Sequence, residues 1–296
     1  MIIGIFGPTA SGKTAFSIKL AEKINGEIVN CDSVAVYKYF NIGSAKPTEM
    51  ERQEAKFHLV DFVEPTTLYS AGDYEKDAHK TIDQILETGK IPIVSGGSGL
   101  YGKVALEGMD NVPETTPQIR EKIGLEIEQD FPGAVQRLLE IDREFALTLD
   151  LANPRRVSRA LEIYELTGEK PSTVYQNAKA PKRPPWKAYC IDWDRDALIE
   201  RINLRVDNMV KEGLFEEVEF LMKNFPLTCQ PFSTIGYKEC VSFFKGEFTK
   251  DETIEKIKIS TRQFAKRQRT WFRKYSNVEL ITLGDLDKII MEIIGD

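Results

Sequence analysis

The sequence predicts an α/β protein, with a P-loop-containing parallel sheet that has helices on both faces, plus an all-helical insertion domain. Apolar, β-branched segments alternate with helical segments in the first part of the chain, which is typical of a doubly wound parallel sheet. The stretch GPTASGKT follows the first apolar segment and matches the phosphate-loop pattern in full. Strand signals stop from about Pro113 to Val174, where only helical patterns remain.

The phosphate loop lies between an apolar strand at residues 2 to 6 and a helical segment from Ala15 to Ile24. Its glycines let successive backbone N–H groups point inward, and the helix N-terminus adds positive potential. The lysine would neutralise phosphates, and the Thr14 hydroxyl could hold Mg²⁺. This geometry recognises a diphosphate and not an adenine, so a nucleoside triphosphate is only the default ligand. The predicted diphosphate-binding residues of the loop are Gly7, Thr9, Ala10, Ser11, Gly12, Lys13 and Thr14.

The alternation continues after the loop. GEIVNCD predicts a strand that ends at Asp32, and FHLVDF is a further apolar segment. YSAGDYEKDAHKTIDQILETGK predicts a helix with a stop at Gly89, and IPIVSGG predicts another buried strand. Ligands of such sheets bind beyond the carboxyl ends of the strands. The phosphate loop, residues 32 to 37 and the SGGSGLY turn (95 to 101) should therefore converge at one edge.

The middle of the chain predicts a helical insertion. TTPQIREKIGLEIEQDF places three isoleucines on one helical stripe, which Phe131–Pro132 closes. NPRRVSRALEIYELTG carries Asn153 as N-cap and Gly168 just past the helix end. The proline-rich APKRPPWK (180 to 187) serves as the return linker. We therefore expect a core domain of residues 1–113 and 184–296, and a helical insertion domain of residues 114–183. AYCIDW then returns to a strand, and LIERINLRVDNMVKEGLFEEVEFLMKNF supplies one or two helices.

Composition sets further limits. The 296 residues give room for one large or two modest domains, and the net charge of −6 argues against a generally adhesive nucleic-acid binder. No apolar run approaches the length of a membrane span, and no targeting segment is evident, so we expect a cytoplasmic protein with no membrane partner. We also expect a monomer. Two histidines practically exclude a multi-histidine metal site. The scattered cysteines favour reduced thiols.

Asp32 and Ser98 are the polar residues at the predicted edge. Asp32 could organise Mg²⁺, could act as a base for a group near the phosphates, or could simply form a turn, and its position leaves function and turn about equal. The Ser98 hydroxyl could bond phosphate or metal, although a tight strand-to-helix turn explains it equally well.

A basic stripe follows one face of a carboxyl-terminal helix: Lys258, Arg262, Lys266, Arg269 and Arg273. A solvated face is the ordinary interpretation of such a pattern. Here, however, the acidic residues stop at Glu255, and no acid four residues along neutralises the stripe. We expect an unpaired cationic ridge that suits a polyanion. A second basic cluster comprises Arg155, Arg156 and Arg159, of which Arg159 could instead pair with Glu162.

Over nearly its full length the chain resembles the tRNA dimethylallyltransferases (tRNA isopentenyl transferases) in their short bacterial form. The matching segments are GPTASGKT, DSVAVYKYFNIGSAKPT, HLVDFVEPTTLYSAGDYEKDA, GGSGLY, NPRRVSRALEIYELTG, RINLRVDNMVKEGLFEEV, IGYKE and TRQFAKRQRTWFR. The resemblance implies that the loop grips dimethylallyl diphosphate and that Mg²⁺ is the cofactor. It also implies transfer of the dimethylallyl group to N6 of adenosine 37, beside the anticodon, in tRNAs that read codons starting with U, with release of diphosphate.

The resemblance also implies roles for single residues. Asp32 matches the family's catalytic base, Ser98 its usual threonine near the substrate, and Arg201 and Arg205 an active-site arginine pair. We assign Asp32, Ser98 and Arg201 to catalysis and Arg205 to the diphosphate. The residues expected to contact the anticodon stem-loop of tRNA are Asp32, Ser33, Val34, Ala35, Arg155, Arg156, Arg159, Arg262, Lys266 and Arg269. The family usually has Gln at the position of Ala35, so this chain lacks a hydrogen-bonding amide in the segment that contacts the target base.

Other functions compete with this interpretation. An isopentenyltransferase acting on free AMP, ADP or ATP would share the loop and the base, and a P-loop small-molecule kinase could use HLVD or YCID as its metal-binding strand. A non-catalytic RNA-binding switch is a third alternative, which the context of Asp32 disfavours. The basic stripe and the helical insertion favour a polynucleotide acceptor, since a free nucleotide needs neither.

Overall fold

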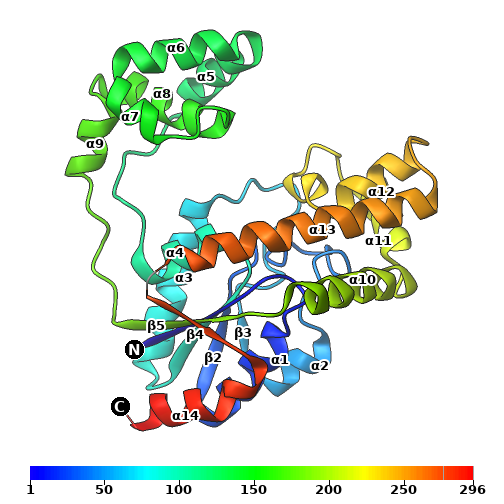
Figure 1. Ribbon diagram of the computed structural model, residues 1–296. Coiled ribbons are helices and arrows are strands. Elements are labelled where there is room, and N and C mark those ends of the chain that lie inside the picture. Colours follow the sequence, from blue (N-terminus) through cyan, green and yellow to red (C-terminus); the bar gives the residue numbers. More distant parts are fainter. Residues whose placement is uncertain (276, 296) are drawn as a thin grey trace. The chain divides into compact units, whose positions relative to one another are not determined.

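A computed structural model describes residues 1–275 and 277–295 of the chain (Figure 1). The chain forms two compact units, one of residues 1–106 together with the part from residue 183 onward, and one of residues 107–182. Within the described residues, every helix is too short or too polar to span a lipid bilayer.

The first unit contains a six-stranded parallel sheet with the strand order β3-β2-β4-β1-β5-β6. Phe6 at the end of β1 pairs with Gly96 of β4, and Asn30 at the end of β2 pairs with Ser95. The loops after these three strands therefore leave the same edge of the sheet. The strands are β1 (Ile2–Phe6), β2 (Gly26–Asn30), β3 (Phe57–His58), β4 (Ile91–Gly96), β5 (Trp186–Ile191) and β6 (Val278–Ile281).

Helices cover both faces of this sheet, which confirms the predicted fold class (Figure 1). Ile3 and Ile5 of β1 pack with α1 (Lys13–Ile24) and α14 (Leu286–Gly295) on one face. The Phe6 ring turns to the other face and stacks on Phe272 at a centroid distance of 4.9 Å. That second face carries α3 (Ala71–Glu87), α4 (Gly99–Glu107) and α13 (Lys250–Arg273). Burial of each such apolar side chain contributes roughly 1.5–3 kcal/mol.

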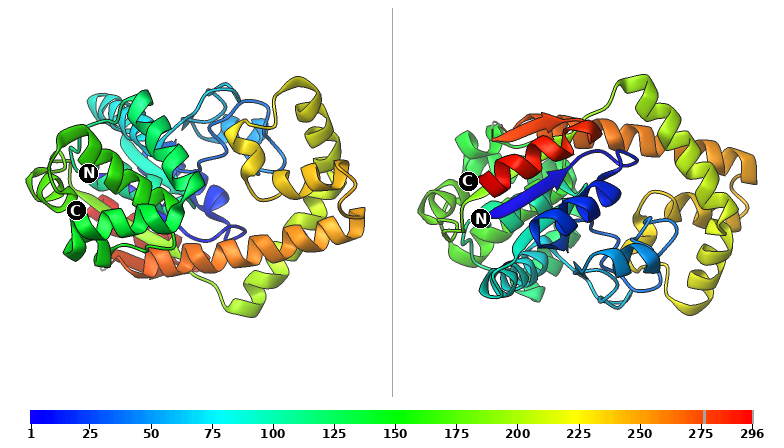
Figure 2. Two further views of the ribbon diagram at one scale, coloured as in Figure 1. Left: turned by 90° about the horizontal axis from the view of Figure 1, so that it is seen from above. Right: turned by 90° about the horizontal axis from the view of Figure 1, so that it is seen from below.

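The remaining helices of this unit include α10 (Arg195–Lys211), which contacts α13 (Figure 2). The segment LIERINLRVDNMVKEGLFEEVEFLMKNF forms two helices, α10 and α11 (Leu214–Asn224). They separate at Gly213, which takes a left-handed φ of 101°. The others are α2 (Glu49–Glu54), α12 (Tyr237–Phe244) and the 3-10 helices Gln230–Ser233 and Leu283–Asp285.

The FHLVDF segment forms much less strand than its composition suggests. Only Phe57–His58 pairs with β2, because Leu59 and Asp61 take left-handed φ values of 58° and 61° and turn the chain away. Strand β6 and helix α14 at the carboxyl-terminal end were not predicted from the sequence at all.

The second unit is helical and has its own apolar core, which includes Ile123, Leu138 and Leu161. The predicted Asn153 cap is confirmed, since its Oδ1 accepts from the Arg155 N–H, and Gly168 ends the helix at a φ of 70°. Helix α5 ends at Gln129, just before Phe131–Pro132, as predicted. The same pair also opens the next helix, since proline fits a first helical turn. The helices are α5 (Pro117–Gln129), α6 (Phe131–Ile141), α7 (Arg143–Thr148), α8 (Pro154–Thr167) and α9 (Pro171–Asn177).

The first boundary between the units falls after Leu106, and not at the expected residue 114. The Arg159 guanidinium of α8 donates to the Thr115 hydroxyl and to the Pro113 carbonyl. These bonds tie the connecting segment to the helical unit. The return boundary lies between Lys182 and Arg183, inside the predicted linker.

A buried carboxylate stabilises the amino-terminal end of β2. Glu27 is only 4% exposed, and its oxygens lie 2.7 Å from Lys90 Nζ, 2.6 Å from His58 Nε2 and 3.0 Å from Lys56 Nζ. Burial raises the pKa of Glu27, but the bonds from Lys90, His58 and Lys56 outweigh it and lower that pKa to about 2. Folding therefore favours the ionised form of this group.

We expect Glu27→Gln to lower the free energy of unfolding by about 1–3 kcal/mol at pH 7. Because the folded pKa lies below the unfolded value, the ionised cluster stabilises the fold above about pH 4.5 and loses this effect as pH falls toward 2. Urea unfolding at pH 7 and at pH 3.5 measures both effects, and the difference between variant and wild type should shrink at the lower pH. Glu22→Gln, at an exposed position of α1, is the control; equal loss in both variants would contradict the assignment.

Candidate functional site

Three loops converge on one cavity at the carboxyl edge of the sheet, as predicted. The cavity has a volume of about 420 Å³, which is within the range of small-ligand pockets. Helices α10 and α13 also line this cavity. Lining residues include Thr9, Lys13, Thr14, Asp32, Ser33, Val34, Ala35, Ser98, Arg205 and Gln268.

The phosphate loop has a left-handed backbone at several positions. Gly7 and Gly12 have φ values of 154° and 90°, and Ala10 has a φ of 64°, which is unusual for a residue with a Cβ. A Cβ on Gly7 would lie 2.9 Å from the Ile191 carbonyl oxygen. Glycine is therefore required at Gly7 for close packing as well as for its backbone angle.

Side chains from outside the loop hold this backbone in place. Arg201 Nε donates to the Ala10 carbonyl at 2.8 Å, and Trp193 Nε1 donates to the Ser11 carbonyl at 3.0 Å. The Arg201 guanidinium also lies over the Trp193 ring, 4.4 Å from its centroid. The predicted catalytic residue Arg201 thus contacts the outer side of the loop, and Trp193, which the sequence did not single out, orients it.

Thr9 and Ser11 are predicted to bind diphosphate, but the Thr9 N–H is already hydrogen-bonded and the Ser11 side chain is buried. The Thr9 N–H donates to Gln268 Oε1 at 2.8 Å, and the Thr9 hydroxyl, which makes no hydrogen bond to the described residues, could donate to a ligand. Ser11 is fully buried, and its hydroxyl has no partner among the described residues. Ser11 does not line the cavity, so its backbone N–H is the group that could take part in anion binding.

Lys13 and Arg205 make the cavity electropositive. Burial lowers the pKa of the Lys13 ammonium to about 8, and Arg205 acts in the same direction, whereas Asp32 raises it. Burial also lowers the pKa of Arg205, against the effect of Asp32. The Lys13 ammonium donates to the Pro8 carbonyl at 2.7 Å, and a phosphate oxygen would compete for this donor. Two cations facing one carboxylate leave an excess of positive charge that suits an anion.

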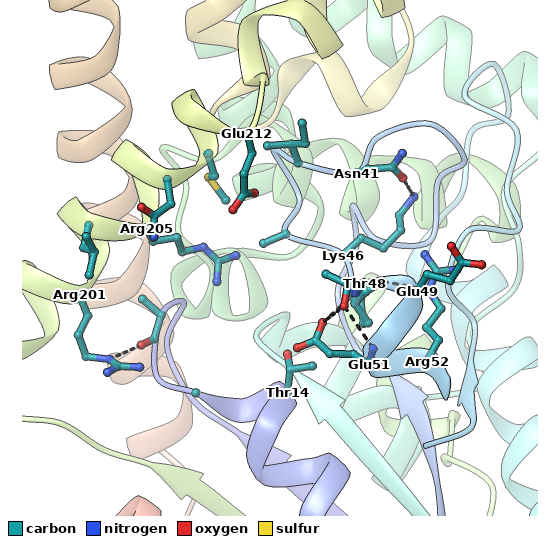
Figure 3. Close-up of a pocket in the computed structure, with 18 of the residues that line it drawn as sticks. Thr14, Asn41, Lys46, Thr48, Glu49, Glu51, Arg52, Arg201, Arg205 and Glu212 are labelled. Carbon is teal, nitrogen blue, oxygen red and sulfur yellow. Dashed lines mark hydrogen bonds between the residues drawn. The ribbon is translucent and has the colours of Figure 1, made fainter. Parts of the chain in front are cut away.

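Thr14 lies at the boundary of this cavity and a second one of about 670 Å³, which Arg201 and Arg205 also line (Figure 3). No hydrogen bond of its hydroxyl is formed within the described part of the chain. That part also contains no cluster of three acidic, histidine or cysteine side chains that could hold a metal. A Mg²⁺ ion here would take the Thr14 hydroxyl together with phosphate oxygens and water, the ligands that Mg²⁺ prefers beside a bound phosphate.

Asp32 combines the two roles that its position allowed. Its Oδ1 accepts from the N–H groups of Val34 at 2.8 Å and Ala35 at 3.3 Å, which makes it a turn aspartate. Its Oδ2 accepts no hydrogen bond from the described residues, and Asp32 lines the cavity. The turn therefore fixes one oxygen and leaves the other for chemistry. Ser98 lies beside it, since its Oγ accepts from Ser33 N–H at 3.0 Å.

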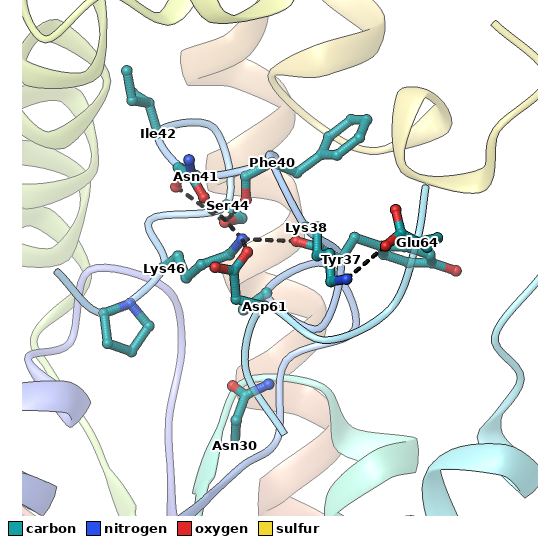
Figure 4. A network of polar contacts seen from close by, with 12 residues as sticks. Asn30, Tyr37, Lys38, Phe40, Asn41, Ile42, Ser44, Lys46, Asp61 and Glu64 are labelled. Atoms are coloured by element: carbon teal, nitrogen blue, oxygen red, sulfur yellow. Dashed lines mark hydrogen bonds and ion pairs between the residues drawn. The ribbon is translucent and has the colours of Figure 1, made fainter. Parts of the chain in front are cut away.

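The loop that carries Asp32 is fixed from behind by a buried lysine that the sequence did not reveal (Figure 4). Lys46 is 7% exposed and donates to the Tyr37 carbonyl at 2.7 Å, to Asn41 Oδ1 at 2.9 Å and to Asp61 Oδ1 at 2.7 Å. Asp61 N–H in turn donates to the Ala35 carbonyl. Burial lowers the pKa of Lys46, whereas Asp61 raises it. No local sequence pattern could have found this contact, because its acceptors lie in two separate loops.

The prediction that the basic stripe is unpaired is wrong. Lys258 Nζ lies 2.8 Å from Asp207 and 3.3 Å from Glu255. Arg269 and Arg273 both bind Asp192, at 3.0 Å and 2.6 Å. The acids that neutralise the stripe lie mainly on α10 and just after β5, so a search along the helix itself does not find them.

The rest of the stripe differs in exposure. Arg262 donates to Asn203 Oδ1 at 2.7 Å and is half-buried against α10. Lys266 is exposed, as is its neighbour Arg267, which also lines the cavity. The cationic surface of α13 is therefore narrower than predicted.

The second basic cluster also divides. Arg155 and Arg156 are exposed on α8. Arg159 is used within the helical unit, since it lies 3.7 Å from Glu162 in addition to its bonds to the connecting segment. This confirms the expected pairing with Glu162.

Fold and site together define a P-loop α/β protein whose cavity places two cations beside a carboxylate. The family model described as IPP transferase matches residues 35–275. The chain belongs to this family of transferases, which includes the tRNA dimethylallyltransferases.

Relatives match along the whole chain. The chain is 40% identical to the tRNA dimethylallyltransferase of Acetivibrio thermocellus, covering 97% of this chain and 93% of that protein. It is also 40% identical to that of Carboxydothermus hydrogenoformans, covering 100% and 96%.

Solved structures agree with this assignment. The tRNA isopentenylpyrophosphate transferase of Bacillus halodurans matches with a TM-score of 0.72 and 35% identity, covering 99% of this chain and 94% of that one. A eukaryotic dimethylallyltransferase acting on tRNA matches with a TM-score of 0.83 and 30% identity, covering 97% and 75%.

The lowered pKa of Lys13 predicts how binding of a diphosphate ester depends on pH. The protonated amine attracts the anion, so affinity for dimethylallyl diphosphate should fall as pH rises through about 8, by up to about tenfold per pH unit. Calorimetric titration between pH 7 and pH 9.5 measures this. Lys13→Arg keeps its charge over that range and should bind with an affinity that does not depend on pH in this way. A wild-type affinity that stays constant above pH 8 would contradict the assignment.

Proposed function

We propose that this chain transfers a dimethylallyl group from dimethylallyl diphosphate to N6 of adenosine 37 in tRNAs that read codons starting with U, and releases diphosphate. One observation carries the proposal: Lys13 of the phosphate loop, Arg205 of α10 and the Asp32 carboxylate, whose Oδ2 accepts no hydrogen bond from the described residues, line the same cavity. The family membership of the chain supports the reaction class.

The donor side of the reaction follows from the loop. The phosphate-loop N–H groups, Lys13 and Arg205 would bind the diphosphate, and Thr14 would hold Mg²⁺ against it. The Mg²⁺ ion, when bound, supplies further positive charge to the leaving diphosphate. These groups stabilise the charge that grows on the leaving oxygen as its bond to the allylic carbon breaks. Arg201 reaches the same loop from α10.

The acceptor side needs a base. The exocyclic amine of adenine is a poor nucleophile, because its lone pair is delocalised into the ring. The allylic carbon must therefore develop cationic character before N6 attacks it. As the new N–C bond forms, the free Oδ2 of Asp32 would take the N6 proton, while the turn bonds to Oδ1 hold the carboxylate in place. Ser98, bonded to the Ser33 N–H, would orient the same segment.

The acceptor adenine would leave the stacked anticodon loop to enter the cavity. Unstacking a loop base costs a few kcal/mol, which contacts to phosphates can offset. The exposed cations that suit this role are Lys266 and Arg267 on α13 and Arg155 and Arg156 on α8. Ala35 is 2% exposed, and its carbonyl is bonded to Asp61 N–H, so the segment offers a methyl group where the family usually has an amide.

A labelled-transfer assay tests the proposal. Purified protein with Mg²⁺ should move label from dimethylallyl diphosphate onto an unmodified tRNA that carries A36–A37. Asp32→Asn should lower turnover by about 10²–10⁴-fold, because the amide cannot accept the N6 proton, while the affinity for tRNA stays close to that of wild type. Asp287→Asn, at an exposed position of α14, is the matched control.

Three outcomes would overturn the proposal in different ways. Label only on free AMP would indicate a free-nucleotide prenyltransferase. Transfer of the ATP γ-phosphate to a small molecule would indicate a kinase. Binding of tRNA without any turnover would indicate a non-catalytic RNA-binding protein.

The exposed part of the basic stripe predicts a salt effect. Lys266→Ala should weaken tRNA binding for all substrate tRNAs alike and reduce the slope of log Kd against log salt by about 1. Filter binding between 50 and 200 mM salt measures this slope. Lys19→Ala removes the same charge from α1, on the opposite face of the sheet, and should leave the slope unchanged. An identical slope in Lys266→Ala and wild type would remove Lys266 from the tRNA contact.

A further inference from the structure

Gln268 forms hydrogen bonds to both the phosphate loop and the turn between β4 and α4, and it lines the 420 Å³ cavity. It lies within α13 and is 5% exposed. Its Oε1 accepts from Thr9 N–H of the phosphate loop at 2.8 Å, and its Nε2 donates to the Gly97 carbonyl of the β4–α4 turn at 2.8 Å. A backbone N–H only donates and a carbonyl only accepts, so these two partners fix the orientation of the side-chain amide.

The side-chain amide of Gln268 is closely packed against the turn that carries Gly97. A Cβ on Gly97 would lie 2.3 Å from Gln268 Nε2, so the turn approaches Gln268 as closely as a glycine allows. One turn further along α13, Phe272 stacks on Phe6 of the central strand. The helix that carries the amide is therefore itself fixed to the sheet.

Gln268 connects the phosphate loop to Asp32 through a short chain of contacts. Gly97 precedes Ser98, whose N–H donates to the Cys31 carbonyl at 3.1 Å and whose Oγ accepts from Ser33 N–H. Cys31 and Ser33 flank Asp32. A shift of the turn relative to the phosphate loop would therefore move the carboxylate relative to the diphosphate.

We propose that Gln268 is a positioning residue that sets the distance between the phosphate loop and the carboxylate of Asp32. This inference rests on the proposed function, in which the donor carbon and N6 must meet between those two groups. Reactions of this kind lose rate steeply when the reacting groups are misplaced by about 1 Å. Binding of each substrate alone does not require the separation to be correct, so the effect should fall on kcat.

The isosteric Gln268→Glu variant tests the donor half of the bridge. Its carboxylate still accepts from Thr9 N–H but cannot donate to the Gly97 carbonyl, and the facing oxygens repel. At pH 8 we expect kcat to fall by about 10–100-fold. Protonation of the introduced carboxyl restores a donor, so the ratio of variant to wild-type kcat should rise as pH is lowered from 8 to 5.5. A purely structural role would change kcat only through the folded fraction, so the urea midpoint measured at each pH would change in parallel with it.

Gln268→Met removes both bonds at similar length. Its loss in kcat should not depend on pH relative to wild type, and its affinity for dimethylallyl diphosphate should stay close to that of wild type because Trp193 and Arg201 still hold the loop. Gln263→Glu adds the same charge at an exposed position of α13 and should leave kcat unchanged.

The proposal is overturned if Gln268→Glu keeps the wild-type kcat at pH 8. It is equally overturned if Gln268→Glu and Gln268→Met show the same dependence of kcat on pH and lose activity only in proportion to the fall in their urea midpoints. Wild type and Gln263→Glu are assayed alongside; absence of transfer in these two would refute the proposed function itself, and not the role of Gln268.

Discussion

Lys13 and Arg205 share one cavity with the carboxylate of Asp32, and the charge balance among these partly buried groups governs the site. Two cations with one anion leave a net positive charge in a place where water cannot solvate it well. The lowered pKa values of both cations express that cost, and a bound diphosphate would remove it. In the proposed reaction, the same positive charge would bind the donor and stabilise its departing diphosphate, so binding and catalysis would depend on one arrangement.

These charged groups keep their positions only if the loops that carry them are held in one conformation. The phosphate loop contains left-handed positions, including one at Ala10, and it stays in place because Trp193, Arg201 and Gln268 bond its backbone from outside. The Asp32 loop is held in a similar way by the buried Lys46. The side chains that hold the phosphate loop come from other elements, and Gln268 among them also lines the cavity.

Helix α13 serves several purposes with different faces. Phe272 packs on the sheet, Gln268 lies between the loops, and Lys266 is exposed. Salt bridges to Asp192 and Asp207 and a hydrogen bond that Arg262 donates to Asn203 attach the other basic side chains of the stripe to neighbouring elements. Most of the basic stripe therefore orients the helix, and a smaller part remains to attract a polyanion.

The sequence by itself determined the phosphate loop, the strand ends that meet beside it, the position of Asp32 and the capped helix α8. These features depend on neighbours within a few residues, where glycine angles, caps and apolar periodicity act. Only the tertiary structure decided which acids neutralise the stripe, that Gln268 and Lys46 hold loops, and where the helical unit begins. Arg262 and Asn203 are 59 residues apart, Arg269 and Asp192 77, and Gln268 and Gly97 171. Side-chain contacts over such separations depend on how whole elements pack, and no local pattern encodes them.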